Sequence, residues 1–151
     1  MMIFAALYAV GVIVLAPTSF YIWQVRFADA LLPLSMIFGW PCAAGLGLGC
    51  LVANVYGGLG VVDIIGGSVA NIIACGLAWK IGGNSRIYRR FLATLVLTAT
   101  LTVIVGGYLS VIFNVPLEFG LLGVFVGSVI SVNILGFLIE EGIRKSGLGQ
   151  L

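Results

Sequence analysis

Five polar side chains that could recognise a small molecule stand at the borders of strongly apolar runs. Gln24, Arg26 and Asp29 lie together in the stretch WQVRFADALLP, and Asn54 and Asp63 lie on either side of the glycine-rich stretch YGGLG. A charged side chain that faces lipid costs about 2.5–3.5 kcal/mol at the middle of a membrane on insertion scales. We therefore expect these groups to face a cavity, water or one another.

Three aromatic residues, Trp23, Phe27 and Tyr56, accompany the polar groups. Their rings could stack on a planar ligand while carboxylates and amides bind its hydrogen-bonding edge, as proteins do with nucleobases. The same rings could instead form a belt of aromatic residues at the membrane interface. The residue types alone leave both roles open.

Four of these polar residues also have a plainer structural role. Arg26 and Asp29 are three positions apart at a helix start, so they could simply pair with each other. Asp63 could cap the helix that it begins, and Asn54 could make a hydrogen bond between helices. We give second rank to three further polar residues that lie deeper or are less clearly placed: Asn71, Tyr108 and Asn133.

The apolar composition places the whole chain in a membrane. Hydrophobic residues make up 62% of its 151 residues and charged residues 8%, whereas soluble domains carry about 25% charged residues. Long uninterrupted apolar runs, in place of alternating runs of ~10 residues, exclude a membrane barrel. We therefore predict an all-α integral membrane protein, with residues 1–151 as a single transmembrane domain that crosses the cell membrane several times.

The apolar runs predict a compact bundle of six transmembrane helices. A spanning helix takes about 20 apolar residues. The uncharged region from Ala30 to Val62 would make a helix of roughly 50 Å, which is too long for one span. Pro41 disfavours helical geometry at Trp40, so we divide the region there. The predicted spans are residues 2–20, about 27–39, about 42–56, 61–79, 91–113 and 119–139.

The basic residues predict which side of the membrane each loop faces. Six of the seven lie in one connection and in the C-terminal stretch: Lys80, Arg86, Arg89, Arg90, Arg144 and Lys145. Two spans separate these groups, so they share a side, and short basic loops stay in the cytoplasm. An even number of spans then places both termini in the cytoplasm and Arg26 on the outer side. Glu140 and Glu141 are expected to form a solvated helix end with Arg144 and Lys145.

Small residues recur at every fourth position in several spans, which lets helix backbones approach closely. We expect three of these stripes to pack within the chain: Gly45, Gly49 and Ala53; Gly66, Ala70, Ala74 and Ala78; and Gly123, Gly127 and Ser131. Ala5 and Ala9 form a similar stripe in the first span. That stripe could pack internally or dock a partner.

The sequence lacks the usual groups of an enzyme. It contains no histidine, which excludes histidine-based catalysis. It also contains neither the phosphate-binding motif G-x-x-x-x-G-K-[ST] nor the nucleophile motif G-x-S-x-G. Cys42, Cys50 and Cys75 are expected to be small packing residues and not zinc ligands. We expect no enzymatic activity, no metal, no cofactor and no nucleic-acid partner.

Two stretches resemble the QueT family. QVRFADAL resembles the Gln-x-Arg-x-x-acid-Ala-Leu segment of that family. Residues 49–70, GCLVANVYGGLGVVDIIGGSVA, resemble its Gly-Cys-x-x-Ala-Asn … Gly-x-x-Asp … Gly-Ser signature without a gap. The resemblance covers nearly the whole chain, with specific motifs in about residues 5–80. The family is similar to the substrate-binding (S) components of energy-coupling-factor (ECF) transporters, which implies a six-helix membrane fold with an outward-facing ligand cavity.

The resemblance implies a substrate-capture subunit for uptake of a queuosine precursor, a 7-deazaguanine base. It implies a transmembrane T component and two cytoplasmic ATPase subunits as partners. Ala5 and Ala9 match the stripe through which such S components dock. The substrate-binding residues would be Trp23, Gln24, Arg26, Phe27, Asp29, Asn54, Tyr56 and Asp63.

The chain departs from the family pattern at three places. Asp29 stands where glutamate is frequent, the Gly57–Gly58 turn stands where Ser-Pro is common, and Ser128 stands near an expected glutamate. The shorter acid and the missing glutamate alter the hydrogen bonds that a ligand could find. Two alternative functions stay open from the sequence: a stand-alone small-molecule carrier driven by an ion gradient, and a structural membrane subunit.

Overall fold

The computed structural model describes residues 1–20 and 25–147, and the regular structure of these residues is entirely helical. The chain begins with α1 (Met2–Val14) and α2 (Ala16–Ser19). A 3-10 helix, η1 (Phe27–Leu34), continues into α3 (Ser35–Phe38). The four remaining segments are α4 (Trp40–Gly57); α5 (Val61–Gly82); α6 (Ile87–Leu101) with the π-helical η2 (Thr102–Gly106) and α7 (Gly107–Ile112); and α8 (Leu117–Ser128) with the π-helical η3 (Val129–Gly136) and α9 (Phe137–Lys145).

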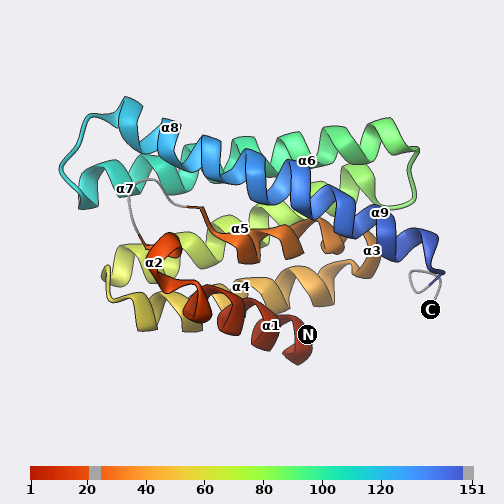
Figure 1. Ribbon diagram of the computed structural model, residues 1–151, viewed down its shortest axis with the longest axis horizontal. Helices are drawn as coiled ribbons and strands as arrows, with labels where there is room; N and C mark the ends of the chain where they lie inside the picture. Colours follow the sequence, from red (N-terminus) through yellow and green to blue (C-terminus); the bar gives the residue numbers. More distant parts are fainter. Residues whose placement is uncertain (21–24, 148–151) are drawn as a thin grey trace.

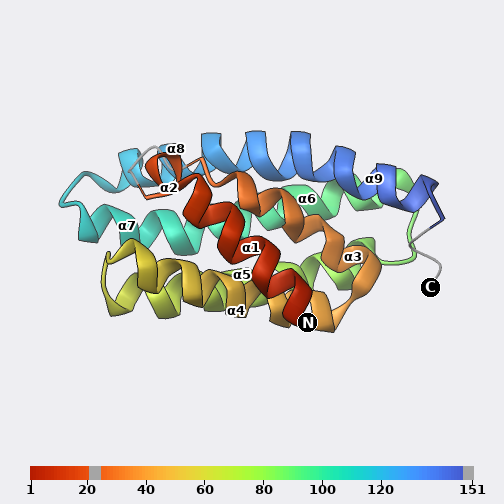
Figure 2. The same cartoon turned by 60° about the horizontal axis from the view of Figure 1, so that its bottom comes forward.

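The helices lie side by side along the long axis of the molecule (Figure 1, Figure 2). α4 packs against α1 and α5, and α5 packs in turn against α6. η1 packs against η3, so the second and last segments of the chain are neighbours. The α4–α5 and α7–α8 turns lie at one end of the bundle (Figure 1). The α3–α4 turn, the α5–α6 loop and the C-terminus lie at the other end, which we call the basic end because it carries Lys80, Arg86, Arg89, Arg90, Arg144 and Lys145.

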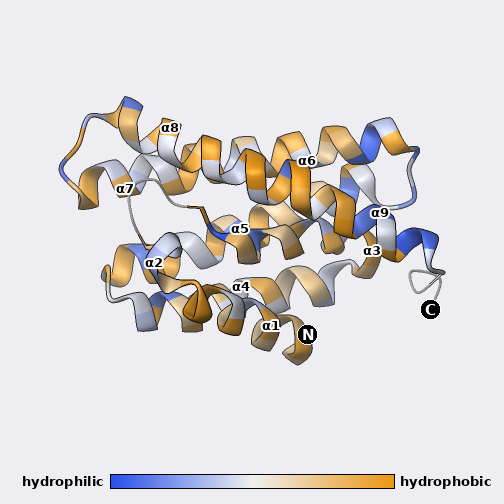
Figure 3. Ribbon diagram, viewed as in Figure 1, coloured by the Kyte–Doolittle hydropathy of each residue, from blue (hydrophilic) through white to orange (hydrophobic). Residues whose placement is uncertain are grey.

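Three helical stretches are long and apolar enough to cross a membrane: Val61–Gly82, Ile87–Ile112 and Leu117–Lys145. Hydrophobic residues cover much of their length, and hydrophilic residues gather near the basic end (Figure 3). α1 has 13 residues, which is about 20 Å of helix, and Leu15 separates it from α2. The predicted run 2–20 is therefore not one continuous helix. The prediction of an all-helical chain is confirmed for the described residues, and the three long apolar helices are compatible with a membrane bundle. The number of spans and the side of the termini stay predictions.

The break between the second and third segments lies at Gly39. Its φ of 65° and ψ of −147° form a conformation that favours glycine. Trp40 is already the first residue of α4, and Pro41 is the second, where the helix needs no N–H donor. The predicted division of the run into two helices is confirmed, but the expectation that Pro41 disfavours helical geometry at Trp40 is wrong. At the far end of α4, Gly58 and Gly60 have positive φ values of 69° and 106° and turn the chain into α5, as predicted.

The small-residue stripes pack within the chain, as predicted. A Cβ atom added to Gly49 would lie 2.6 Å from the Ala5 carbonyl oxygen and 2.9 Å from Tyr8 Cβ. α1 therefore crosses α4 at a separation that only glycine permits at this point. The other two stripes are also largely buried, in the residues Ala70, Ala74, Ala78, Gly123, Gly127 and Ser131. This close crossing of α1 and α4 fixes the depth at which Tyr8 enters the bundle.

Candidate functional site

A buried arginine stands at the centre of the polar groups that the sequence predicts together. Arg26 directly precedes η1 and is only 4% exposed. Its Nη2 donates to Asn54 Oδ1 at 3.0 Å and lies 3.9 Å from Asp63 Oδ1. Its Nε donates to the Ser19 carbonyl oxygen at 3.3 Å, and its guanidinium lies 5.6 Å from the centre of the Phe20 ring. These contacts compensate the removal of the guanidinium charge from water.

Asn54 connects the last turn of α4 to the first turn of α5. Its Nδ2 donates to the backbone oxygen of Asp63 at 2.8 Å, which leaves Oδ1 free to accept from Arg26. The two helices come this close because the chain reverses within the four residues from Gly57 to Gly60. The predicted hydrogen bond between helices is confirmed, and it also orients the side chain that holds Arg26.

Asp63 carries a carboxylate oxygen without a hydrogen-bond partner among the described residues. The side chain is fully buried. Its Oδ1 accepts from Tyr108 Oη at 2.9 Å, whereas Oδ2 has no such partner. Asp63 is the third residue of α5, and no side chain of the described residues caps that helix, so the alternative role as a helix cap is not seen. A buried acceptor left unsatisfied costs about 1–3 kcal/mol, which a ligand N–H could recover.

Asp29 pairs with a tyrosine of the first helix and not with Arg26. Tyr8 Oη donates to Asp29 Oδ1 at 2.5 Å, and both residues are buried. The one ion pair of Arg26 within the described residues is with Asp63. The proposed pairing of Arg26 with Asp29 is therefore wrong, because the 3-10 geometry of η1 directs the acid toward α1. We call the residues Tyr8, Arg26, Asp29, Asn54, Asp63 and Tyr108 the Arg26 cluster.

Two of the predicted aromatic residues, Phe27 and Tyr56, do not join the Arg26 cluster. Phe27 is 38% exposed and Tyr56 is 64% exposed, so their stacking on a ligand stays a prediction. Trp23 and Gln24 lie outside the described residues. The aromatic side chains that the structure does bring to the cluster are Tyr8, Phe20 and Tyr108.

Tyr8 is the functional candidate that the sequence analysis missed. It is the one side chain with a strong hydrogen-bonding group in α1, and a buried tyrosine hydroxyl usually finds a partner. That signal could have identified it. Tyr108 had second rank because its place in the membrane was less clear, and the structure shows that it contacts Asp63, 45 positions earlier in the chain. Cys50 is a buried packing residue as expected, but its sulfur also lies 3.6 Å from Arg26 Nη1.

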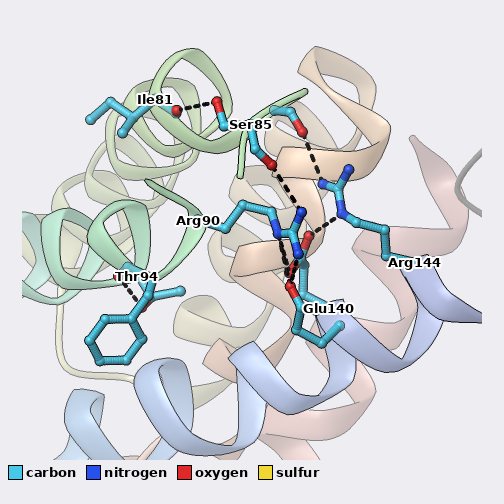
Figure 4. A network of polar contacts seen from close by, with 9 residues as sticks. Ile81, Ser85, Arg90, Thr94, Glu140 and Arg144 are labelled. Carbon is cyan, nitrogen blue, oxygen red and sulfur yellow. Dashed lines mark hydrogen bonds and ion pairs between the residues drawn. The ribbon is translucent and has the colours of Figure 1, made fainter. Parts of the chain in front are cut away.

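A second buried polar cluster lies at the basic end (Figure 4). Glu140 is fully buried and accepts from Arg144 Nε at 2.7 Å, while its Oε2 lies 3.6 Å from Arg90 Nε. Arg90 also pairs with Glu141, and Arg144 Nη2 donates to the Gly83 carbonyl oxygen at 3.0 Å. The prediction of a solvated helix end is wrong, because these contacts join α9 to α6 and to the α5–α6 loop. We call Arg90, Glu140, Glu141 and Arg144 the Glu140 cluster.

The Arg26 cluster gathers several groups that can make hydrogen bonds with a polar molecule. It offers a guanidinium, two carboxylates, an amide and two phenols, from helices at one end of the bundle. Its central members are at most 7% exposed in this structure: Tyr8, Arg26, Asp29, Asn54 and Asp63. A ligand would therefore enter only after side chains part. Two surface hollows of the described residues lie elsewhere, one beside Thr102 and Phe125 and the other beside Trp40 and Trp79.

Comparison with known proteins identifies a family for nearly the whole chain. The family model described as QueT transporter matches residues 1–145. No curated protein and no solved structure matches the chain.

Proposed function

The chain belongs to the QueT transporter family, and from this premise we propose that it captures a queuosine precursor, a 7-deazaguanine base, for uptake across the cell membrane. The family match and the three long apolar helices make it a membrane protein of a transporter family. The ligand, the binding residues and the source of energy are the parts that we propose here.

One observation carries the proposed site: the unpaired Asp63 Oδ2 beside Arg26 and Asn54. A deazaguanine presents N–H donors on one edge and a carbonyl oxygen next to them. The Asp63 carboxylate could accept from the N–H groups, and Arg26 could donate to the carbonyl oxygen. Hydrogen bonds to charged groups contribute about 1.5–3 kcal/mol each, so this pair would dominate both affinity and the preference for guanine-like bases.

Asp29 and Tyr8 extend the proposed site toward α1. The short Tyr8–Asp29 hydrogen bond holds the carboxylate within the bundle. We propose that a bound base replaces part of these internal contacts, as Asp29 and Asp63 accept from the ligand. Trp23, Gln24, Phe27 and Tyr56 complete the set that we propose to contact the ligand, with the aromatic rings stacking on its faces.

We propose that the chain spans the membrane six times with the basic end in the cytoplasm. Support comes from the arrangement of charges. Arg26 contacts Asn54 and Asp63 beside the α4–α5 turn, which lies at the end away from the basic end (Figure 1), and short basic loops stay in the cytoplasm. The Arg26 cluster would then lie toward the outer side, where a substrate arrives. Cysteine accessibility labelling from each side of the membrane tests this orientation.

We propose that a T component and two ATPase subunits supply the energy, and that the whole subunit rocks in the membrane. The sequence carries no phosphate-binding motif of its own. Docking through the Ala5–Ala9 stripe would use chiefly Ala5, since Ala9 is only 9% exposed. The strongly exposed residues Ile3, Leu7 and Val10 lie on the other face of α1, whereas the Ala5–Ala9 face packs toward Gly49 of α4.

The experiment is calorimetric titration of the purified protein with 7-deazaguanine and with 7-deazaadenine, which lacks the same donor and acceptor pattern. Tight binding of the first and weak binding of the second support the proposed site. Equal affinities, or no binding of either base, contradict it.

A stand-alone carrier is the second candidate, because Asp63 is a fully buried acid with one oxygen that has no hydrogen-bond partner among the described residues. A carrier driven by an ion gradient requires such a titratable group. Uptake of the base by liposomes that contain only this chain, with an ion gradient and no ATP, would favour the carrier over the capture subunit.

A further inference from the structure

An apolar groove crosses the surface between α4 and α5 at the basic end. Its volume is about 290 Å³, and its lining includes Trp40, Ile73, Gly76, Leu77, Trp79 and Lys80. We infer that this groove binds one acyl chain of an anionic phospholipid and that Lys80 pairs with the lipid phosphate. The inference concerns the lipid contacts of the protein and is independent of the molecule that it transports.

Two tryptophan rings form the walls of this Trp40–Trp79 groove. The Trp79 ring lies over the α3–α4 turn, where a Cβ atom on Gly39 would come within 3.2 Å of it. The Trp40 ring reaches back over α5, to 4.0 Å from a Cβ atom on Gly76. Each ring therefore covers a glycine of the neighbouring segment. Gly76 has no side chain, so the space between the rings stays open.

The position of these rings fits a membrane interface. Trp40 is 53% exposed and Trp79 is 42% exposed, although both are large and apolar. α5 is one of the helices long enough to span a membrane, and Trp79 and Lys80 lie in its last turn. Tryptophan gathers at the boundary between hydrocarbon and headgroups. An acyl chain beside Ile73 and Leu77 would therefore extend from the headgroup level into the hydrocarbon.

Charge selects an anionic lipid over a neutral one. Lys80 is the one charged residue among those that line the groove, and it is exposed at its edge. A lysine stem packs on apolar surface while its ammonium group reaches the headgroups. The neighbouring loop adds the exposed Arg86 and Arg89 to the same end, and a basic surface next to a membrane attracts anionic lipids.

The test is native mass spectrometry of the detergent-purified protein equilibrated with phosphatidylglycerol or with phosphatidylcholine. We expect wild type to retain phosphatidylglycerol preferentially. Lys80→Gln should lower that retention by about fivefold, which corresponds to one lysine near an anionic surface. Lys145→Gln is the matched control, because Lys145 is exposed at the same end but does not line the groove.

A second variant tests the space and not the charge. Gly76→Leu should fill the groove and lower retention of both lipids, and Trp40 is the one neighbour that the new side chain first meets. Gly142→Leu is its control, since no atom of the described residues lies within 4 Å of a Cβ atom added there. Gly76→Ala replaces the larger variant if thermal unfolding shows that Gly76→Leu is not folded. Equal retention of the two lipids by wild type, equal effects of Lys80→Gln and Lys145→Gln, or full retention by a folded Gly76 variant would each overturn the inference.

Discussion

Asn54 donates a hydrogen bond of 2.8 Å to the backbone oxygen of Asp63 and so joins the end of α4 to the start of α5. The same amide accepts from Arg26 at 3.0 Å. One neutral side chain thus holds both Asp63 and Arg26 in place. This relationship explains why an arginine can remain 4% exposed in a chain with so few charged residues.

Asn54→Ala should therefore destabilise the protein well beyond the loss of one contact. The change leaves the Arg26 guanidinium without its amide acceptor and the Asp63 backbone oxygen without its donor, and a lost hydrogen bond to a buried charged group costs about 1.5–3 kcal/mol. Thermal unfolding in detergent measures the effect. Asn84→Ala, in the exposed α5–α6 loop, is the control, and equal midpoints for the two variants would contradict the role of Asn54.

Tyr8→Phe should weaken the fold by about 1–3 kcal/mol, because Asp29 Oδ1 loses the hydroxyl that donates to it inside the bundle. The ring and its packing remain, so the change isolates the hydrogen bond. Tyr56→Phe provides the comparison, since Tyr56 is 64% exposed and such surface changes stay within about 0.5 kcal/mol. A loss no larger than that of Tyr56→Phe would show that Asp29 does not depend on Tyr8.

Glu140→Gln should destabilise the basic end. Glu140 is fully buried between Arg90 and Arg144. The neutral amide of glutamine removes the negative charge that faces both guanidinium groups. We expect a loss on the order of 3 kcal/mol, at the lower end for a broken buried ion pair because Arg144 is partly exposed. Unfolding is measured beside Glu118→Gln, an exposed acid at the other end. If both variants unfold at the same temperature as wild type, the Glu140 cluster does not stabilise the fold.

Gly49→Val should disrupt the crossing of α1 and α4, because a Cβ atom there already comes within 2.6 Å of the Ala5 carbonyl oxygen. Overpacking of this kind costs about 1–3 kcal/mol. Gly107→Ala, at a helical glycine with nothing within 4 Å of the added atom, should be neutral or slightly stabilising. A midpoint for Gly49→Val as high as for Gly107→Ala would mean that α1 can shift without penalty.

The helical class and the grouping of Arg26, Asn54 and Asp63 could be predicted from the sequence, because apolar runs and costly charges leave few arrangements in a membrane. The turn after Tyr56 could also be predicted, because glycine readily adopts positive φ. Gly58 and Gly60 both do so in the structure. The partners of each charge could not be predicted. Asp29 turns to Tyr8 and Asp63 to Tyr108, and these contacts join helices whose relative rotation no local pattern encodes.

Glu140 shows the same limit at the other end of the bundle. Its spacing from Arg144 predicts a helix-surface pair, and that pair does form. Its burial depends on Arg90 and on the α5–α6 loop, which lie about fifty residues earlier in the chain. The break at Gly39 lies one residue before the predicted one. Proline is also favoured in the first turn of a helix, so Trp40 and Pro41 both belong to α4.

The most direct test of the proposed function compares wild type with Asp63→Asn in calorimetric titrations with 7-deazaguanine. This substitution keeps the shape of the side chain but replaces the unpaired acceptor Oδ2 with either a neutral oxygen or a donor. We predict that wild type binds the base and that Asp63→Asn binds it at least about tenfold more weakly, as expected for the loss of a hydrogen bond to a charged group. Glu118→Gln should bind as wild type does. Equal affinity of the wild type and Asp63→Asn, or no binding by wild type, would contradict the proposed function.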